Sequence, residues 1–382
     1  MQKITILDTT LRDGDQASGF HFLKSEKVEM AKQLSKLGVD VIEAGFACSS
    51  QGDFDSIYSI SKELGEDVII CSLSRAADKD IEQSAKALEP AKKKRIHTFI
   101  ATSDIHINGK LKKDRNWVTN QAVKAVRKAK NYVNDVEFSC EDFGRSNLNY
   151  VVDIVSEAIK AGATTINLPD TVGFLTPNDA YFRVKYVIEK IKENYSDVVF
   201  SVHNHNDLGM ATANTLHGIL AGARQVEVTI NGIGERAGNT ALEEIVAILR
   251  AKDMGYYCNV NAEYIAETSA ICSRFTGITP QPNKAITGKN AFSHEAGIHQ
   301  DGMIKDRNTY EIIIPEEFGY KSKQTFGPRS GRNALREKYG QLGLFFTDGE
   351  FERVHAKFKS FSDDRKLIYD DDLIKICKSS SI

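Results

Sequence analysis

The sequence predicts an α/β fold, a closed (β/α)8 TIM barrel followed by a small, mainly helical C-terminal subdomain. Short apolar runs alternate eight times with longer amphipathic runs, with a repeat of roughly 30 residues. The short runs are continuously apolar, which is typical of parallel strands buried on both faces. No G-x-G-x-x-G motif follows a short run, which disfavours the dinucleotide-binding version of the competing doubly wound sheet.

Each expected strand is an apolar run that precedes an amphipathic segment with apolar residues at helical spacing. The expected strands are residues 3–8, 40–45, 67–73, 95–101, 135–139, 164–168, 198–203 and 225–230. The expected helices are residues 26–37, 51–64, 80–91, 116–132, 147–161, 178–193, 211–222 and 241–253. The alternation stops after about residue 255, so we expect a catalytic barrel over residues 1–255 and a helical linker or subdomain over residues 256–382.

Helical patterns continue in the C-terminal region at residues 262–275, 329–342 and 348–361. A loop-rich stretch, residues 276–324, follows the first of them. The last stretch, residues 366–382, is weakly patterned, and we expect it to be frayed.

Composition excludes several classes of partner. The formal net charge of −2 gives no basic excess for nucleic acid or an anionic membrane. No apolar run reaches the roughly 18 residues of a membrane helix, and no signal peptide precedes the first strand. The six cysteines are scattered without a CxxC pair, which favours reduced thiols in the cytoplasm.

The ends of the first and seventh expected strands carry the residues of a candidate metal site. In a (β/α)8 barrel the active site lies at the carboxyl ends of the strands. Asp13 offers a carboxylate to a hard cation, and Arg12 beside it offers a guanidinium to a substrate carboxylate or carbonyl. His203 and His205 are two residues apart on a strand, so both point to one face. We expect these two histidines and Asp13 to bind a divalent cation, for which Mn²⁺, Mg²⁺ and Zn²⁺ are all suitable.

Polar residues at other strand ends are expected to surround this cation. The glycine-rich segment 231–239 allows close backbone approach and ends in Asn239, which can add an oxygen ligand. Glu141 ends the fifth strand and would face a metal-bound substrate. In the C-terminal region, residues 293–301 contain two histidines and two acids, for which we favour a general-base role of one histidine over a second metal site. The other candidates at strand ends are Glu43, His97, Ser139, Asn167 and Thr171.

These motifs resemble the alpha-isopropylmalate synthase family, within a metal-dependent barrel group that also includes homocitrate and citramalate synthases. The resemblance covers about residues 3–340. The segments typical of the whole group are D-T-T-L-R-D-G (8–14), H-N-H-N-D-L-G (203–209) and N-G-I-G-E-R-A-G-N (231–239). Those similar to isopropylmalate synthases in particular are C-S-L-S-R-A (71–76), R-I-H-T-F-I-A-T-S (95–103), V-E-F-S-C-E-D (136–142) and F-S-H-E-A-G-I-H-Q-D-G (292–302).

The resemblance implies a Claisen-type condensation of acetyl-CoA with the 2-oxo acid 3-methyl-2-oxobutanoate, followed by thioester hydrolysis, in leucine biosynthesis. It implies a homodimer in which the C-terminal region of one chain lies over the barrel of its partner. Members of the family commonly carry a further C-terminal domain that binds leucine. The sequence ends at residue 382, so we expect either an enzyme that leucine does not inhibit or a truncated form of a longer chain.

The resemblance also implies a role for each candidate residue. Asp13, His203 and His205 would bind the metal, with Asn239 near it, and Arg12 would hold the oxo group of the substrate. Proton transfer falls to Glu141 and His299, with Tyr310 close by. The oxo-acid pocket would be lined by His97, Ser139, Asn167 and Thr171. Asp15 stands where relatives usually carry Glu, and we expect a small effect.

Three alternatives stay open from the sequence. A homocitrate or citramalate synthase would use 2-oxoglutarate or pyruvate, and a second substrate carboxylate would require a further basic group, for which His97 is the candidate. A hydroxymethylglutaryl-CoA lyase would have a cysteine in the glycine-rich segment 231–239, which contains none. A non-catalytic paralogue would lack a metal ligand, whereas Asp13, His203 and His205 are all present.

Overall fold

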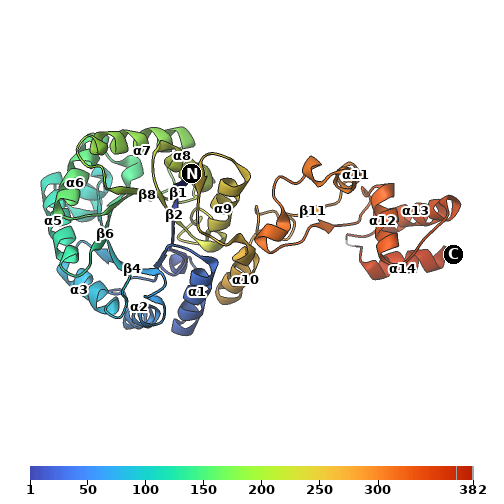
Figure 1. Ribbon diagram of the computed structural model, residues 1–382, viewed down its shortest axis with the longest axis horizontal. Coiled ribbons are helices and arrows are strands. Elements are labelled where there is room, and N and C mark those ends of the chain that lie inside the picture. Colours follow the sequence, from blue (N-terminus) through green and yellow to red (C-terminus); the bar gives the residue numbers. More distant parts are fainter. Residues whose placement is uncertain (367, 381–382) are drawn as a thin grey trace. The chain divides into compact units, whose positions relative to one another are not determined.

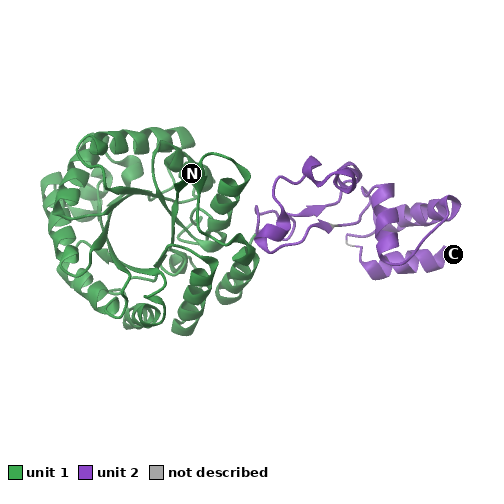
Figure 2. Cartoon of the chain, in the orientation of Figure 1, with its two compact units in different colours: residues 1–280 green, residues 281–382 purple. Residues whose placement is uncertain are grey.

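The computed structural model describes residues 1–366 and 368–380. The chain forms two compact units, residues 1–280 and residues 281–382, here named the barrel unit and the C-terminal unit (Figure 2). The barrel unit ends later than the expected boundary at residue 255. Two contacts explain the difference: β10 (Tyr256–Tyr257) pairs with β1 (Gln2–Lys3), and Gln33 of α1 donates a hydrogen bond to Thr268 of α10.

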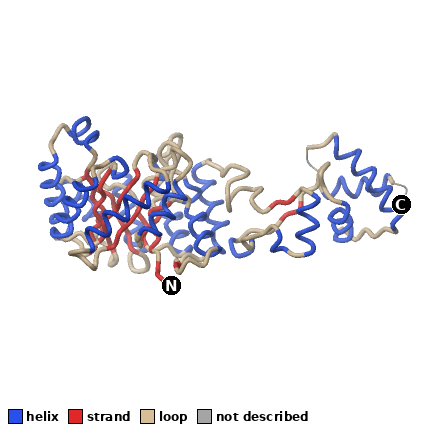
Figure 3. Tube along the Cα trace, turned by 90° about the horizontal axis from the view of Figure 1, so that it is seen from above, coloured by secondary structure: helices blue, strands red, loops and turns tan. Residues whose placement is uncertain are grey.

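Eight parallel strands close into a barrel in chain order, β2 to β9, and helices surround them (Figures 1 and 3). The (β/α)8 fold predicted from the sequence is confirmed. The barrel strands are β2 (Thr5–Asp8), β3 (Val41–Glu43), β4 (Ile69–Arg75), β5 (Lys94–Ala101), β6 (Asp135–Glu141), β7 (Thr165–Asp170), β8 (Val199–Asn204) and β9 (Gln225–Val228). The helices are α1 (Lys24–Leu37), α2 (Gln51–Leu64), α3 (Asp78–Ala87), α5 (Arg115–Lys130), α6 (Leu148–Ala161), α7 (Pro177–Lys192), α8 (Ala211–Ala221), α9 (Leu242–Ala251) and α10 (Ile265–Thr276).

The barrel interior is polar, although its strands look apolar in sequence. Arg95 lies on β5, and its Nη1 donates to Glu137 at 2.8 Å and to Gln225 at 2.7 Å, on β6 and β9. His97, two residues further along β5, shares this face and is also buried. Ile96, between them, is fully buried on the opposite face of the strand. Alternation therefore places paired charges inside the barrel, below the carboxyl ends of the strands.

The connection between β5 and α5 contains structure that the sequence pattern does not predict. A short helix, α4 (Asp104–His106), runs directly into a π-helical turn at Ile107–Leu111. Ser103 caps α4 by accepting a hydrogen bond from the His106 amide. This connection carries Lys110, which reaches the end of β6 and forms an ion pair with Glu141.

The C-terminal unit contains a two-stranded parallel sheet of β11 (Ser293–His294) and β12 (Lys323–Gln324), with α11 at Gly297–Lys305. Its remaining helices are α12 (Arg332–Gln341), α13 (Asp348–Asp363) and α14 (Asp370–Ser379), and they share a hydrophobic cluster. The expectation of a frayed end is wrong for α14, because Leu373, Ile376 and Cys377 lie at helical spacing and are buried in that cluster. Residues 367, 381 and 382, which the same expectation covers, lie outside the described residues. Among the described helices, none is both long and apolar enough to cross a membrane.

Candidate active site

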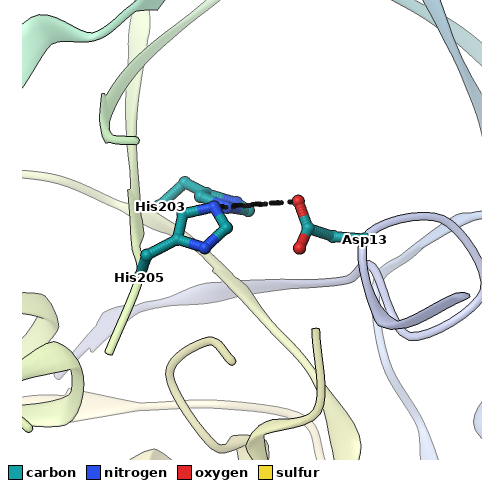
Figure 4. Close-up of side chains that lie close together, drawn as sticks. All are labelled: Asp13, His203 and His205. Carbon is teal, nitrogen blue, oxygen red and sulfur yellow. Dashed lines mark hydrogen bonds and ion pairs between the residues drawn. The ribbon is translucent and has the colours of Figure 1, made fainter. Parts of the chain in front are cut away.

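Asp13, His203 and His205 converge at the carboxyl end of the barrel (Figure 4). Asp13 follows β2, His203 lies near the end of β8, and His205 comes directly after β8. The Nε2 atoms of both imidazoles lie 3.8 Å from Asp13 Oδ2 and 3.2 Å from each other. All three side chains are buried, and one ligand atom of each lies within 4.8 Å of the other two.

The charge states of these groups suit metal binding. Burial lowers the pKa of both His203 and His205 to about 4, although the Asp13 carboxylate opposes this shift. Burial would raise the pKa of Asp13, but Arg12 and the two imidazoles outweigh it and hold that pKa below its usual range. Two neutral imidazoles and one carboxylate thus face a common point. Among the described residues, the buried atoms Asn239 Oδ1 and His205 Nδ1 lack a hydrogen-bond partner.

The glycine-rich segment after β9 packs so tightly at two positions that only glycine fits there. Asn239 Nδ2 donates to Asp13 Oδ1 at 2.8 Å and so holds the carboxylate. Gly234 has a φ of 155°, and a Cβ there would overlap Asn239 Nδ2 and lie 2.9 Å from Asp13 Oδ1. A Cβ on Gly238, with a φ of 89°, would overlap the carbonyl oxygen of Gly232. Glycine at these positions lets the backbone close around Asp13.

A buried lysine fastens the loop that carries Asp13. Lys27 of α1 lies 2.8 Å from Asp15 in this loop and 2.7 Å from Asp53 of α2, and its side chain is 3% exposed. Asp15 also accepts a hydrogen bond from the Phe22 amide at 2.7 Å. Asp15 therefore ties this loop to Phe22 and to α1.

Arg12 is held between two carboxylates. Its Nη1 donates to Asp13 at 2.5 Å and its Nε donates to Glu43 at 2.6 Å. Burial would raise the pKa of Glu43, but Arg12 and His97 outweigh it and hold that pKa below its usual range. Glu43 is thus an ionised acceptor that fixes the plane of the guanidinium.

A hydrogen-bonded chain continues from Glu43 across the cavity floor. His97 Nδ1 lies 2.7 Å from Glu43, and His97 Nε2 lies 2.6 Å from Ser139 Oγ. Burial would lower the pKa of His97, but Glu137 and Glu43 outweigh it and raise that pKa to about 9. The imidazolium donates to Ser139, whose oxygen also accepts from Asn167 Nδ2 at 2.8 Å. With both lone pairs occupied, the Ser139 hydroxyl hydrogen is available to an acceptor in the cavity.

Glu141 and Thr171 lie on the cavity wall, but both have protein partners. The Glu141 carboxylate lies 2.6 Å from Lys110 Nζ and 3.9 Å from His106 Nδ1. Thr171 Oγ1 accepts a hydrogen bond from the backbone amide of Asp142, a residue in the left-handed conformation with a φ of 63°.

The cavity at the barrel mouth has a volume of about 220 Å³. Thirteen polar residues share its wall with three apolar side chains. The residues that sequence reasoning predicted here are Arg12, Asp13, His97, Ser139, Glu141, Asn167, Thr171, His203 and His205. Those that it missed are Gln16, Leu73, Phe99, Pro169, Glu227, Glu235 and Arg236. His299 and Tyr310 belong to the C-terminal unit, where their ring centroids lie 4.2 Å apart.

Glu227 is the most informative of the missed residues. Its Oε2 lies 2.9 Å from His203 Nδ1, and it is buried in the barrel interior. Burial raises its pKa well above the usual value. The signal for it was the Q-V-E-V run of β9, in which every second residue is polar and points into the barrel.

Comparison with known proteins shows to which family the chain belongs. Residues 3–272 match the HMGL-like family model, and residues 286–366 match the model described as homocitrate synthase post-HMGL domain-like. The chain is 51% identical over 375 residues to a 2-isopropylmalate synthase of Campylobacter fetus, covering 97% of this chain and 73% of the relative. It is 51% identical to one of Pyrococcus abyssi, covering 98% and 77%. The chain belongs to the 2-isopropylmalate synthase family.

Solved structures agree with this family in fold. A hydroxymethylglutaryl-CoA lyase of Pseudomonas aeruginosa superimposes with a TM-score of 0.61 at 19% identity, covering 73% of this chain and 95% of the lyase. The 2-isopropylmalate synthase family is metal-dependent and joins acetyl-CoA to a 2-oxo acid, and the donor set of Asp13, His203 and His205 fits a divalent cation. The relatives extend beyond the part matched here, and leucine insensitivity stays a prediction.

Proposed function

We propose that the chain condenses acetyl-CoA with 3-methyl-2-oxobutanoate and then hydrolyses the thioester, releasing 2-isopropylmalate and CoA. One observation carries the proposal: a cluster of two neutral imidazoles and one carboxylate adjoins Arg12 and a Ser139 hydroxyl donor in a single cavity. A 2-oxo acid presents a carbonyl and a carboxylate on adjacent carbons, and this cavity offers complementary groups to both.

Asp13, His203 and His205 would hold the divalent cation, with Asn239 Oδ1 available as a further oxygen donor. When bound, the cation acts as a Lewis acid for the oxo acid and stabilises developing negative charge. A mixed imidazole and carboxylate set suits Mn²⁺, Mg²⁺ and Zn²⁺, and we propose one of these three as the cation.

Arg12 stabilises the alkoxide that forms on the oxygen of the oxo group as the enolate bonds to the oxo carbon. Asp13 and Glu43 engage its Nη1 and Nε, which leaves other guanidinium N–H donors for the substrate. Because both carboxylates fix the guanidinium before the substrate arrives, little reorganisation is needed as charge develops.

The His97–Ser139–Asn167 chain binds the substrate carboxylate, because the Ser139 hydroxyl donates into the cavity. Leu73 and Phe99 add apolar surface to the same cavity. A branched alkyl group fits this surface better than the second carboxylate of 2-oxoglutarate, whose burial against apolar side chains would be costly.

Glu141, His299 and Tyr310 complete the proton-transfer set, as the family resemblance suggests. His299 and Tyr310 come from the C-terminal unit of the same chain or of a second copy. We propose a homodimer, which the highly exposed apolar side chains of Ile298 and Ile312, at 79% and 81%, support. The cysteines, all unpaired, agree with a cytoplasmic location.

The test is CoA release from acetyl-CoA, followed with a thiol reagent, in the presence of each of four 2-oxo acids. With Mn²⁺ supplied, we expect the highest kcat/KM with 3-methyl-2-oxobutanoate and lower values with 2-oxoglutarate, pyruvate and 2-oxobutanoate. A higher value with 2-oxoglutarate or pyruvate would overturn the substrate assignment. Release of CoA with none of the four would overturn the proposed activity.

A further inference from the structure

Four carboxylates line the cavity, and the protein already binds three of them. Asp13 accepts from Arg12 and Asn239, at 2.5 and 2.8 Å. Glu141 is paired with a lysine at 2.6 Å, and Glu227 with a histidine at 2.9 Å. The carboxylate of Glu235 accepts no hydrogen bond and forms no ion pair with any residue that the structure describes. Among these four, Glu235 is the carboxylate whose lone pairs are free to accept a proton.

The backbone holds Glu235 from both sides. Gly234 packs so closely against Asp13 and Asn239 that a Cβ would not fit. Arg236, with a φ of 55°, forms two hydrogen bonds to Asp207 at 2.8 and 2.9 Å and a third to the Thr171 carbonyl at 2.9 Å. The backbone on both sides of Glu235 is therefore fixed, by the contact of Gly234 with Asp13 and by the hydrogen bonds of Arg236 to Asp207.

The Glu235 side chain lies between cavity and solvent. It lines the cavity but is only half-buried, and Arg236 and Ala237 after it are exposed. Water can therefore reach its carboxylate from the open side. Contact with water would be unfavourable for a base that generates an enolate, because water quenches such a reactive species. The same contact is required for a base that activates water.

We propose that Glu235 is the general base of the second half-reaction, the hydrolysis of the thioester. This inference rests on the proposed function, because the condensation creates that thioester. Glu235 takes a proton from a water molecule as the water oxygen bonds to the thioester carbonyl carbon. The carbonyl π electrons move to oxygen, then re-form the double bond as the carbon–sulfur bond breaks. The thiolate of CoA takes the proton from Glu235, and the new carboxylic acid loses its own proton to solvent.

The test compares Glu235→Gln with the wild type in two assays. In the first, acetyl-CoA and 3-methyl-2-oxobutanoate are mixed with enzyme, and quenched samples are analysed by mass spectrometry. We expect Glu235→Gln to form the thioester of 2-isopropylmalate with CoA and to accumulate it, while CoA release falls about 100-fold or more. In the second, the synthetic thioester is added directly, and its hydrolysis should fall by the same factor.

Two further variants separate chemistry from folding. Glu235→Asp keeps a carboxylate and should recover part of the hydrolysis. Glu157→Gln removes a carboxylate on α6, away from the cavity lining, and should behave as wild type. Each variant is checked for an unchanged thermal midpoint.

The inference is overturned if Glu235→Gln hydrolyses the added thioester at the wild-type rate. It is also overturned if this variant fails to form the thioester from acetyl-CoA, because Glu235 would then act in the condensation. A wild type that forms neither the thioester nor 2-isopropylmalate contradicts the proposed function, and hydrolysis of the added thioester still decides the role of Glu235.

Discussion

Replacing Glu227 with leucine should separate metal affinity from folding stability. The Glu227 carboxylate lies 2.9 Å from His203 Nδ1, while the Nε2 of the same ring faces Asp13. A hydrogen bond at Nδ1 fixes the ring orientation and the tautomer that leaves Nε2 free to bind a metal. Glu227→Leu removes this restraint and changes no ligand.

Glu227→Leu should weaken metal binding and leave the free energy of unfolding almost unchanged or higher. Loss of such a partner typically weakens metal binding by roughly 10- to 100-fold, which is about 1.4 to 2.7 kcal/mol. Folding should not suffer equally, because burial raises the pKa of Glu227 and shows that its ionised form is unfavourable there. An apolar side chain of similar size removes that cost, so the free energy of unfolding should stay within about 1 kcal/mol of wild type or rise.

The assay is calorimetric titration of Mn²⁺ into metal-stripped protein, paired with urea unfolding of the same samples. Glu227→Gln keeps an acceptor for His203 Nδ1 and should lose less affinity than Glu227→Leu. Ser201→Ala is the matched control, since its hydroxyl lies 3.4 Å from Glu227 and does not touch His203 in the described contacts. Unchanged Mn²⁺ affinity in Glu227→Leu would refute the reasoning, as would a loss of affinity matched by an equal loss of folding stability.

Three other predictions follow from buried contacts. Lys27→Met should lower the free energy of unfolding, measured in urea, by on the order of 1–3 kcal/mol. The loss is smaller than for a fully buried ion pair because the two carboxylate partners of Lys27 are 16% and 24% exposed. An unchanged free energy of unfolding would contradict the anchoring role of Lys27. Gly234→Ala should reduce Mn²⁺ affinity at least about tenfold by calorimetry, because the new Cβ displaces Asn239 or Asp13, and wild-type affinity would show that the loop can yield. The pKa of His97 is raised from 6.5 to about 9, so its stabilisation is full below pH 6.5 and lost as pH rises through about 9. Urea unfolding across this range should show a loss of about 3 kcal/mol that His97→Gln lacks, and an identical pH profile in both proteins would contradict the charged state of His97.

The sequence predicts the barrel and the metal cluster because both depend on residue patterns that extend over only a few positions of the chain. His203 and His205 share a face by strand alternation, and the rule that barrel sites lie at strand ends brings Asp13 to the same edge. Neither inference requires knowledge of long-range packing. The eight strand positions likewise follow from local apolar runs, with ends displaced by one or a few residues.

The remaining features depend on contacts between distant segments. Glu227 is separated from His203 by 24 residues, and only closure of β8 beside β9 brings them together. Glu235 is distinguished by the absence of a partner among the described residues, and a motif does not encode that property. The helix α14 forms because Leu373 and Ile376 find an apolar cluster on α12 and α13, although its own sequence pattern is weak.

The central claim is that Asp13, His203 and His205 bind the cation on which turnover depends. The most direct measurement titrates Mn²⁺ into metal-stripped wild type and His203→Ala while CoA release from acetyl-CoA and 3-methyl-2-oxobutanoate is followed. We expect no release before metal is added, saturation at one Mn²⁺ per chain in the wild type, and neither tight binding nor turnover in His203→Ala. Wild-type turnover without metal, or wild-type binding and turnover in His203→Ala, would contradict the account.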